Sequence, residues 1–301
     1  MSHSLRPWLL ATRPKTLPAA IVPVWVGSAP AIFGLGNGVE FSLVLFLSAL
    51  ASCLCIQIAT NLFNDAIDSH KGADTEKRLG PARATASGML SARAVMLGAL
   101  GFCLLAAIIA VPMIQARGWP IIAIGGVSLV MAFAYTGGPF PLAYRGMGEL
   151  FVILFFGFLA VMGSWFVQSG EGPGLWQWIT GLQAGLYSSV LIAINNLRDI
   201  DEDRQSRKHT LAVRFGKGFA RFEIALFCFG PIALALFAAW HWNEVWFALP
   251  AATLSLGLLI VKKVRSTEPS AIYNKYLAMS AVQLLGFAAL LTLGLWAAGR
   301  S

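Results

Sequence analysis

The amino-acid sequence predicts an all-α integral membrane protein with nine transmembrane helices. Hydrophobic residues make up 57% of the 301 residues and charged residues only 12%, whereas soluble proteins carry roughly a quarter. Mean hydropathy is +0.70, and apolar segments long enough to cross a bilayer recur along the whole chain. These segments leave no room for a separate soluble domain, so residues 1–301 are expected to form a single transmembrane domain.

Nine apolar segments define the expected helices, and each is bounded by polar or Gly/Pro-rich residues. The connections after the first, third, fifth and seventh segments are short and rich in Gly and Pro, and those after the even-numbered segments are long or basic. Successive connections therefore belong to opposite sides of the membrane. The expected spans are residues 17–35, 41–63, 92–114, 119–135, 148–168, 176–197, 219–240, 244–262 and 277–298.

Basic residues are segregated strongly between the two sets of connections. Apart from Arg117 and Arg300, all of the 22 Lys and Arg residues fall in the N-terminal segment or in the even-numbered connections. The positive-inside rule then predicts a cytoplasmic N-terminus and an external C-terminus, in a multi-pass protein of the bacterial cytoplasmic (inner) membrane. The net charge of +8 belongs to these loops, so we expect membrane lipids as partners and no nucleic acid.

Acidic and amide side chains gather where the second apolar segment ends. Asn61, Asp65 and Asp68 are spaced i, i+4 and i+7, and on a helix we expect them to share one face. Asn64 lies among them and Asp74 follows in the loop. Carboxylates placed so closely repel each other unless a cation lies between them. For a single motif of this kind, solvated loop charge is the better interpretation.

The end of the sixth apolar segment repeats this pattern. Asn195 and Asp199 again form Asn-x-x-x-Asp, and Asp203 follows one turn later. Asn61 and Asn195 are 134 positions apart, as are Asp65 and Asp199. A separation of four spans preserves direction through the membrane, so both motifs are expected at the cytoplasmic ends of parallel helices, as in a protein built from two similar halves.

The two motifs together supply only hard oxygen donors, which favour magnesium over zinc or copper. The four Cys residues lie in apolar runs without metal-ligand spacing and are expected to be buried. Magnesium is usually bound by a few carboxylates together with substrate phosphates, so a diphosphate is the expected partner, neutralised further by loop Lys and Arg. The expected metal ligands are Asn61, Asp65, Asp68, Asn195, Asp199 and Asp203, and the four aspartates among them are the expected catalytic residues.

The sequence resembles the UbiA superfamily of intramembrane aromatic prenyltransferases. Residues 61–74 and 195–204 resemble its two aspartate-rich motifs. Other stretches resemble the MenA branch of that superfamily, the 1,4-dihydroxy-2-naphthoate polyprenyltransferases. These are residues 11–18, 135–139, 144–149 and 208–216.

The resemblance implies a large central cavity that opens laterally to lipid, with two magnesium ions held by the paired motifs and bridged by the diphosphate of a polyprenyl diphosphate. It implies transfer of the polyprenyl group to 1,4-dihydroxy-2-naphthoate with loss of CO2 and diphosphate, giving demethylmenaquinone in menaquinone biosynthesis. Stabilising the departing diphosphate promotes an allylic carbocation, which an electron-rich ring captures. An intramembrane pocket protects that carbocation from water.

Two alternatives stay open at this stage. The acceptor can be another aromatic compound, such as 4-hydroxybenzoate or homogentisate. The protein can also be a divalent-cation carrier, since acidic residues line membrane helices in such proteins. A carrier needs a polar route across the whole bilayer, and the middle and external parts of the expected helices here contain almost no charges.

Residues outside the two motifs are expected to contribute to substrate binding. Arg13 and Lys15 precede the first span, where they either bind an aromatic carboxylate or anchor the helix to headgroups. Arg145 is the only basic residue of its loop, and diphosphate contact is expected there. Glu149, which begins the fifth span, is either a site residue or a carboxylate stabilised by the helix dipole. The expected substrate-binding residues are Asn61, Asn64, Asn195, Asn196, Lys77, Arg83, Arg145, Tyr135, Arg204, Lys208, Arg13 and Lys15.

Overall fold

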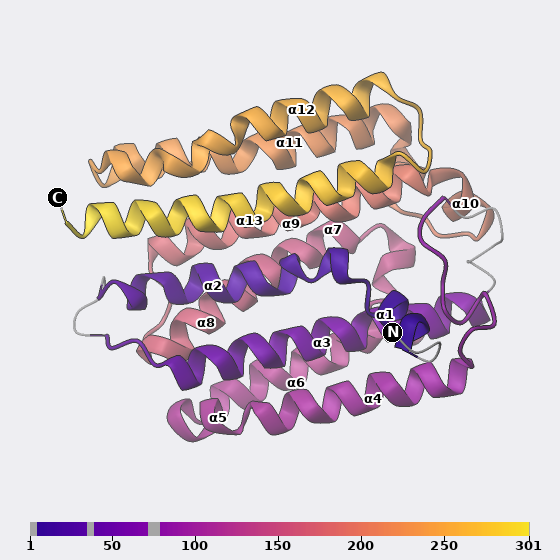
Figure 1. Ribbon diagram of the computed structural model, residues 1–301, viewed down its shortest axis with the longest axis horizontal. Helices are drawn as coiled ribbons and strands as arrows, with labels where there is room; N and C mark the ends of the chain where they lie inside the picture. The colour runs from indigo at the N-terminus through magenta and orange to yellow at the C-terminus, as the bar shows by residue number, and fades with distance from the viewer. Residues whose placement is uncertain (1–4, 35–38, 72–78, 301) are drawn as a thin grey trace.

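The computed structural model shows an all-helical bundle whose long helices run along a common axis (Figure 1), and it describes residues 5–34, 39–71 and 79–300. Helices α1 and α10 lie at one end, hereafter the motif end, and the C-terminus lies at the other. The elements are α1 (Leu5–Thr12), η1 (Pro14–Thr16), α2 (Pro18–Ile32), α3 (Leu43–His70), α4 (Ala92–Ile109), α5 (Val111–Arg117), α6 (Trp119–Ala134), η2 (Leu142–Arg145), α7 (Gly148–Val152), η3 (Ile153–Leu159), α8 (Ala160–Ser169), α9 (Leu175–Arg198), α10 (Ile200–Gln205), α11 (Leu211–His241), η4 (Val245–Thr253), α12 (Leu254–Ser266) and α13 (Tyr273–Ala298).

Every expected span coincides with a helical segment. Among the described residues, six segments are long and apolar enough to cross a membrane, and they contain α3, α4 with α5, α7 to α8, α11, η4 with α12, and α13. Helices α2 and α6 are apolar but shorter, and α9 carries several Gln, Ser and Asn side chains. The multi-pass membrane fold is therefore confirmed, whereas nine crossings and the orientation of the termini stay predictions.

Local sequence signals explain where the helices begin and break. The hydroxyl groups of Ser42, Ser91 and Thr210 accept hydrogen bonds from backbone amides in the first turns of α3, α4 and α11, as N-caps do. Gly216 (φ 82°, ψ 175°) interrupts α11 in a conformation that other residues rarely adopt, so α11 consists of two helices across a kink.

The fifth expected span is one run of helix that contains a seven-residue π-helical segment, η3. Glycines bring this segment against α9. A Cβ atom on Gly157 would lie 2.6 Å from the carbonyl oxygen of Gly181, and one on Gly185 would lie 3.0 Å from the Cα of Ile153. The two backbones are thus in direct contact, as glycine permits between membrane helices.

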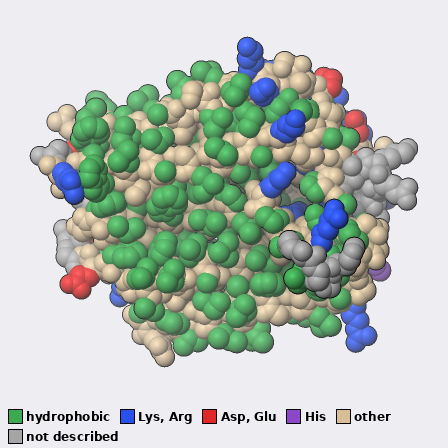
Figure 2. Space-filling model, in the orientation of Figure 1, with side chains coloured by type: hydrophobic (Ala, Val, Ile, Leu, Met, Phe, Trp, Pro, Cys, Tyr) green, Lys and Arg blue, Asp and Glu red, His purple; other side chains and the backbone are tan. Residues whose placement is uncertain are grey.

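Helix α9 lies at the centre of the bundle. Its buried residues belong to two apolar clusters, one shared with α11, α12 and α13 and the other with α2, α8 and α13. Hydrophobic side chains cover much of the visible face of the molecule, whereas Lys and Arg side chains gather toward the motif end (Figure 2). Because α9 is surrounded by other helices, the acidic motif at its end is buried as well.

Candidate functional site

A cavity of about 720 Å³ runs through the bundle beside α3, α6, α8 and α9. Its motif end is lined by amide, acidic and basic side chains. The remainder is lined mainly by apolar residues of α4, α5, α6 and α8, including Met113, Ile121 and Val167. Ala107, Ile122 and Gly126 are among the lining residues of this apolar part and are exposed. This volume is in the range of small-molecule sites in proteins.

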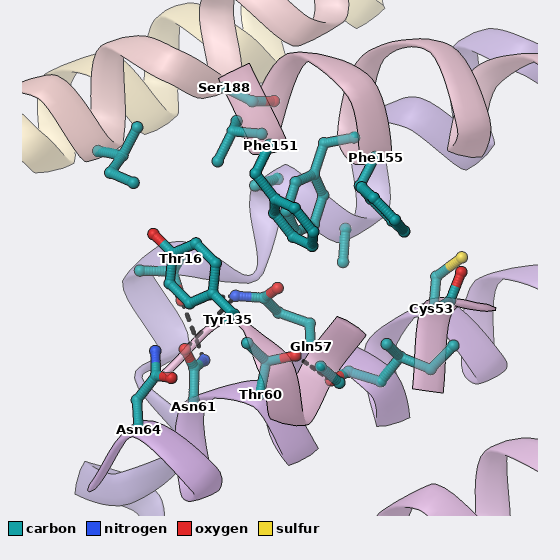
Figure 3. Close-up of a pocket in the computed structure, with 18 of the residues that line it drawn as sticks. Thr16, Cys53, Gln57, Thr60, Asn61, Asn64, Tyr135, Phe151, Phe155 and Ser188 are labelled. Atoms are coloured by element: carbon teal, nitrogen blue, oxygen red, sulfur yellow. Dashed lines mark hydrogen bonds between the residues drawn. The ribbon is translucent and has the colours of Figure 1, made fainter. Parts of the chain in front are cut away.

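Helix α3 presents one polar face to the cavity, made by Gln57, Asn61, Asn64 and Asp68 (Figure 3 shows the first three). The side-chain amide of Asn61 donates to the carbonyl of Thr12 at 2.9 Å and to the hydroxyl of Thr16 at 3.2 Å, which holds the segment before α2 over the cavity. The hydroxyl group of Thr136 donates to the side-chain oxygen of Asn64.

Asp65 does not belong to this cavity face, so the expectation that Asn61, Asp65 and Asp68 point at one place is wrong. At 3.6 residues per turn, Asp65 lies about 60° around the helix from Asp68. Its carboxylate accepts hydrogen bonds from the backbone amides of Ala84 (3.1 Å) and Thr85 (2.9 Å). Asp65 therefore fixes the loop after α3, and this loop covers the motif end of the cavity with Pro81, Ala82 and Arg83.

The correspondence between the two motifs is shifted as a result. In α3 the residues of the form Asn-x-x-x-Asp that face the cavity are Asn64 and Asp68. At the end of α9 they are Asn195 and Asp199. Both members of this correspondence differ by 131 positions instead of 134. The sequence contains both registers, and only the helix phase in the folded protein distinguishes them.

Arg198 neutralises the second motif in this structure. Its guanidinium group donates to both carboxylate oxygens of Asp199 (2.7 and 2.6 Å), to the side-chain oxygen of Asn195 (2.6 Å) and to that of Asn274 on α13 (2.7 Å). The amide of Asn274 in turn donates to the carbonyl of Leu79 at 3.0 Å. This chain of contacts joins α9, α13 and the loop held by Asp65.

Asp203 lies one turn beyond Asp199, on α10, and is buried. Burial raises the pKa of its carboxyl group to about 6, although Lys208, whose Nζ lies 3.5 Å from Oδ1, acts in the opposite direction. Its Oδ2 atom has no hydrogen-bond partner within the described part of the chain. A buried carboxylate oxygen without a partner is costly, so Asp203 is suited to bind a cationic ligand.

Most of the predicted substrate-binding residues line the cavity, and two do not. The exposed guanidinium of Arg145 lies 3.7 Å from the ring centroid of Phe140, and Arg204 is exposed and pairs with Asp201 at 3.6 Å. Lys77, like Asp74, lies outside the described residues. The predicted residues that line the cavity are Arg13, Lys15, Asn61, Asn64, Arg83, Tyr135, Asn195, Asn196 and Lys208.

Tyr144 replaces its neighbour Arg145 as the site residue of the loop between α6 and α7. Its hydroxyl donates to Asp68 at 2.9 Å, and the Nζ of Lys71 lies 4.3 Å from its ring centroid. Gly146 (φ 70°) lets this loop pack against the segment before α11, because a Cβ atom there would lie 2.9 Å from the carbonyl oxygen of His209. Tyr144 and Arg198 were both visible in the motifs, but nothing in the sequence marks them as contacts of the aspartates.

The donor chemistry of this site fits magnesium. Asp68, Asp199 and Asp203 supply carboxylate oxygens to one cavity, with Asn61, Asn64 and Asn195 supplying amide oxygens. Among the described residues no three acidic, His or Cys side chains converge as a ready metal-binding group. Arg198 holds Asp199 in this structure, while Tyr144 and Arg83 hold Asp68.

Removing Arg198 is expected to destabilise the fold. Arg198→Met removes the guanidinium group that neutralises the buried carboxylate of Asp199, and breaking a buried pair in this way typically costs about 3 to 5 kcal/mol. The thermal midpoint in detergent measures the loss. The double variant Arg198→Met/Asp199→Leu removes the buried carboxylate as well and is expected to recover most of the stability. If the single and double variants are equally unstable, the pair does not act in this way.

Comparison with known proteins identifies the family of this chain. Residues 20–284 match the model of the UbiA prenyltransferase family. The chain belongs to the UbiA prenyltransferase family. It is 36% identical over 271 residues to the 1,4-dihydroxy-2-naphthoate octaprenyltransferase of Escherichia coli (strain K12), covering 86% of this chain and 83% of that protein. It is also 36% identical to the Mycobacterium tuberculosis protein of the same name, over 84% and 85% of the two chains.

Solved UbiA structures share the fold at low sequence identity. The structure of a UbiA homolog from Archaeoglobus fulgidus bound to DMAPP and Mg2+ has a TM-score of 0.63 and 15% identity, covering 95% of this chain and 99% of that one. The apo structure of a UbiA homolog from Aeropyrum pernix K1 has a TM-score of 0.66 and 15% identity, covering 93% and 96%. The predicted resemblance to the UbiA superfamily and its MenA branch is thus confirmed, and so is the enzyme class. The protein is a UbiA-family prenyltransferase.

Proposed function

We propose that this protein transfers a polyprenyl group from polyprenyl diphosphate to 1,4-dihydroxy-2-naphthoate, with loss of CO2 and diphosphate, in menaquinone biosynthesis. The observation that carries the proposal is a cavity that joins an oxygen-rich, basic motif end to a long apolar arm. This division matches a substrate with a charged head and a hydrocarbon tail. The acceptor is proposed from the names of the E. coli and M. tuberculosis relatives.

The motif end is suited to hold the diphosphate. Arg83 and Lys208 line the cavity beside Asp68 and Asp203, and each is close to one of these carboxylates. Basic groups of this kind stabilise the negative charge that develops on a departing diphosphate. We assign magnesium, proposed as two ions, to Asp68, Asp199 and Asp203 with Asn61, Asn64 and Asn195. When bound, the metal lowers the cost of charge separation in the same step.

The apolar arm is suited to hold the prenyl chain and to keep water away from the reacting carbon. Its lining by α4, α5, α6 and α8 is mainly aliphatic, with Ile114, Ile124 and Leu129 among its residues. A long prenyl chain is proposed to enter this arm from the lipid beside the exposed residues Ala107, Ile122 and Gly126. In the proposed orientation, with nine crossings, the motif end faces the cytoplasm of a bacterial cell and the C-terminus lies outside.

Prenyl-transfer activity in detergent tests the proposal. The wild-type protein is expected to convert 1,4-dihydroxy-2-naphthoate and polyprenyl diphosphate into prenylated product, and chelation of divalent cations is expected to abolish the reaction until magnesium is added back. Product formation is followed by chromatography. Turnover that is unchanged by chelation contradicts the metal assignment, and a cation flux without prenyl transfer contradicts the proposed function as a whole.

The quinone content of cells is a second way to identify the aromatic acceptor. Cells that lack the protein are expected to lose menaquinone, and re-expression is expected to restore it. Normal menaquinone together with missing ubiquinone identifies 4-hydroxybenzoate as the acceptor instead.

A further inference from the structure

Glu149, at the start of α7, is a buried carboxylate in the cavity wall. Its side chain is 2% exposed, and its Oε1 atom accepts a hydrogen bond from the side-chain amide of Asn196 at 2.7 Å. Its Oε2 atom is buried and has no hydrogen-bond partner among the described residues. Leaving a buried carboxyl oxygen unsatisfied costs free energy, which indicates that a ligand supplies the missing partner.

The surrounding helices hold this carboxylate in a fixed position. The hydroxyl group of Ser189 donates to the backbone carbonyl of Glu149 at 3.4 Å. Close contact between η3 and α9 at Gly157 and Gly185 prevents α7 from moving away from Asn196. The π-helical segment follows directly, and such segments occur frequently at functional sites. Glu149 is therefore positioned by the backbone of two packed helices.

Aromatic side chains line the same cavity as Glu149. The rings of Phe151 and Phe155 are stacked with centroids 4.2 Å apart, and the ring of Tyr135 lies 5.3 Å from that of Phe151. Ser188, on the same side of the cavity as the two Phe residues (Figure 3), has a buried hydroxyl group without a partner in the described residues. A flat aromatic ligand packs well against such a wall.

Glu149 also lies close to the second acidic motif. Asn196, which donates to Glu149, is adjacent in sequence to Asn195 of the second motif, so Glu149 lies in the cavity wall near the motif end. The motif end is where the proposed function places the diphosphate. An aromatic group beside Glu149 is therefore close to the end of the prenyl chain that reacts.

We propose that Glu149 binds the aromatic acceptor by accepting a hydrogen bond from one of its ring hydroxyl groups. This inference rests on the proposed function and adds the contact that orients the acceptor. An ionised carboxylate has only acceptor sites, so it suits a hydroxyl group and repels the carboxylate of the acceptor. A hydroxyl group that donates to a carboxylate gives more electron density to its ring, which favours attack on the allylic carbon.

The variant Glu149→Gln tests this contact by steady-state kinetics with purified protein in detergent. Loss of a hydrogen bond to a charged group is expected to raise the acceptor KM about tenfold to a hundredfold. The KM for prenyl diphosphate is expected to stay within about twofold, since Glu149 does not touch that substrate in the proposal. The variant Glu149→Asp keeps the carboxylate but moves it back from the cavity, and it is expected to raise the acceptor KM in the same way. It serves as a second test in case Glu149→Gln does not fold.

Acceptor analogues identify the hydroxyl group. In the wild-type protein, methylation of one of the two hydroxyl groups of 1,4-dihydroxy-2-naphthoate is expected to reduce kcat/KM as much as Glu149→Gln does. In Glu149→Gln the same methylation is expected to have little further effect, because the contact is already missing. Additive losses from the substitution and from both methylations overturn the proposal.

The matched control is Glu223→Gln on α11. Glu223 is also buried, at 5% exposure, and it is close enough to Glu149 for their charges to interact, but it does not line the cavity. This control is expected to leave both KM values unchanged, and an equal rise in acceptor KM assigns the effect of Glu149→Gln to loss of a buried carboxylate in general. A wild-type protein that prenylates 4-hydroxybenzoate but not the naphthoate overturns the proposed acceptor alone, and the variants then test the hydroxyl contact with that phenol.

Discussion

Asp68→Asn and Asp199→Asn are each expected to reduce kcat/KM for prenyl transfer by about a thousandfold, since a metal clamp stabilises the transition state by several kcal/mol and each 1.4 kcal/mol is tenfold in rate. Both carboxylates line the motif end of the cavity. Amide side chains keep the size and the hydrogen-bond acceptor but remove the charge that holds a cation. The measurement is prenyl-transfer activity at increasing magnesium concentrations. High magnesium is expected to restore part of the lost activity of each variant.

Asp201→Asn is the matched control for this prediction. Asp201 lies between Asp199 and Asp203 in the sequence, but its side chain is 69% exposed and pairs with Arg204 on the surface. Activity is expected to stay within about twofold of the wild type, as is usual for an exposed pair. Equal losses in Asp201→Asn and Asp199→Asn rule out a specific clamp and favour a general effect of the acidic loop.

Asp65→Asn is expected to behave differently from Asp68→Asn and Asp199→Asn. Asp65 holds the backbone amides of Ala84 and Thr85, so the amide variant weakens the loop and lowers the thermal midpoint. The magnesium dependence of the protein that remains folded is expected to be close to that of the wild type. A shifted magnesium requirement in Asp65→Asn returns Asp65 to the ligand set.

The membrane fold was predictable because its signals are long and redundant. A segment such as Leu43–His70 is apolar over most of its length, and an error of a few residues at either end does not change its assignment. The π-helix at Ile153–Leu159 was not predictable, because it depends on the approach of Gly157 to α9. Secondary structure there is determined by a tertiary contact and not by the local sequence.

The composition of the site was predictable, but the facing of individual side chains was not. Asn64 and Asp65 are neighbours, and both belong to plausible Asn-x-x-x-Asp pairings. Since the apolar residues of α3 are spread around the whole helix, hydrophobic periodicity does not reveal which side of its polar end faces the cavity. The choice between Tyr144 and Arg145 depends likewise on a short 3-10 turn and on the positive φ of Gly146.

Gly125→Phe is expected to change the prenyl length that the enzyme accepts. Gly125 lines the apolar arm on α6, and a Cβ atom there would meet nothing within 4 Å, so a phenyl ring has room to project into the arm. Each buried CH2 group of a prenyl chain contributes about 0.8 kcal/mol, so excluding a single five-carbon unit costs at least a hundredfold in kcat/KM at roughly 1.4 kcal/mol per tenfold. The variant is expected to keep activity with dimethylallyl diphosphate and to lose it with long-chain diphosphates.

Folding is not expected to limit this experiment, because replacing a helical Gly removes a cost of up to about 1 kcal/mol. Gly101→Phe is the matched control: Gly101 on α4 is also free of neighbours within 4 Å, but it is exposed and does not line the cavity. Competition between short and long prenyl diphosphates in one reaction gives the ratio of kcat/KM values directly. An unchanged ratio in Gly125→Phe places the prenyl chain elsewhere, whereas a shifted ratio in Gly125→Phe alone locates the chain along α6.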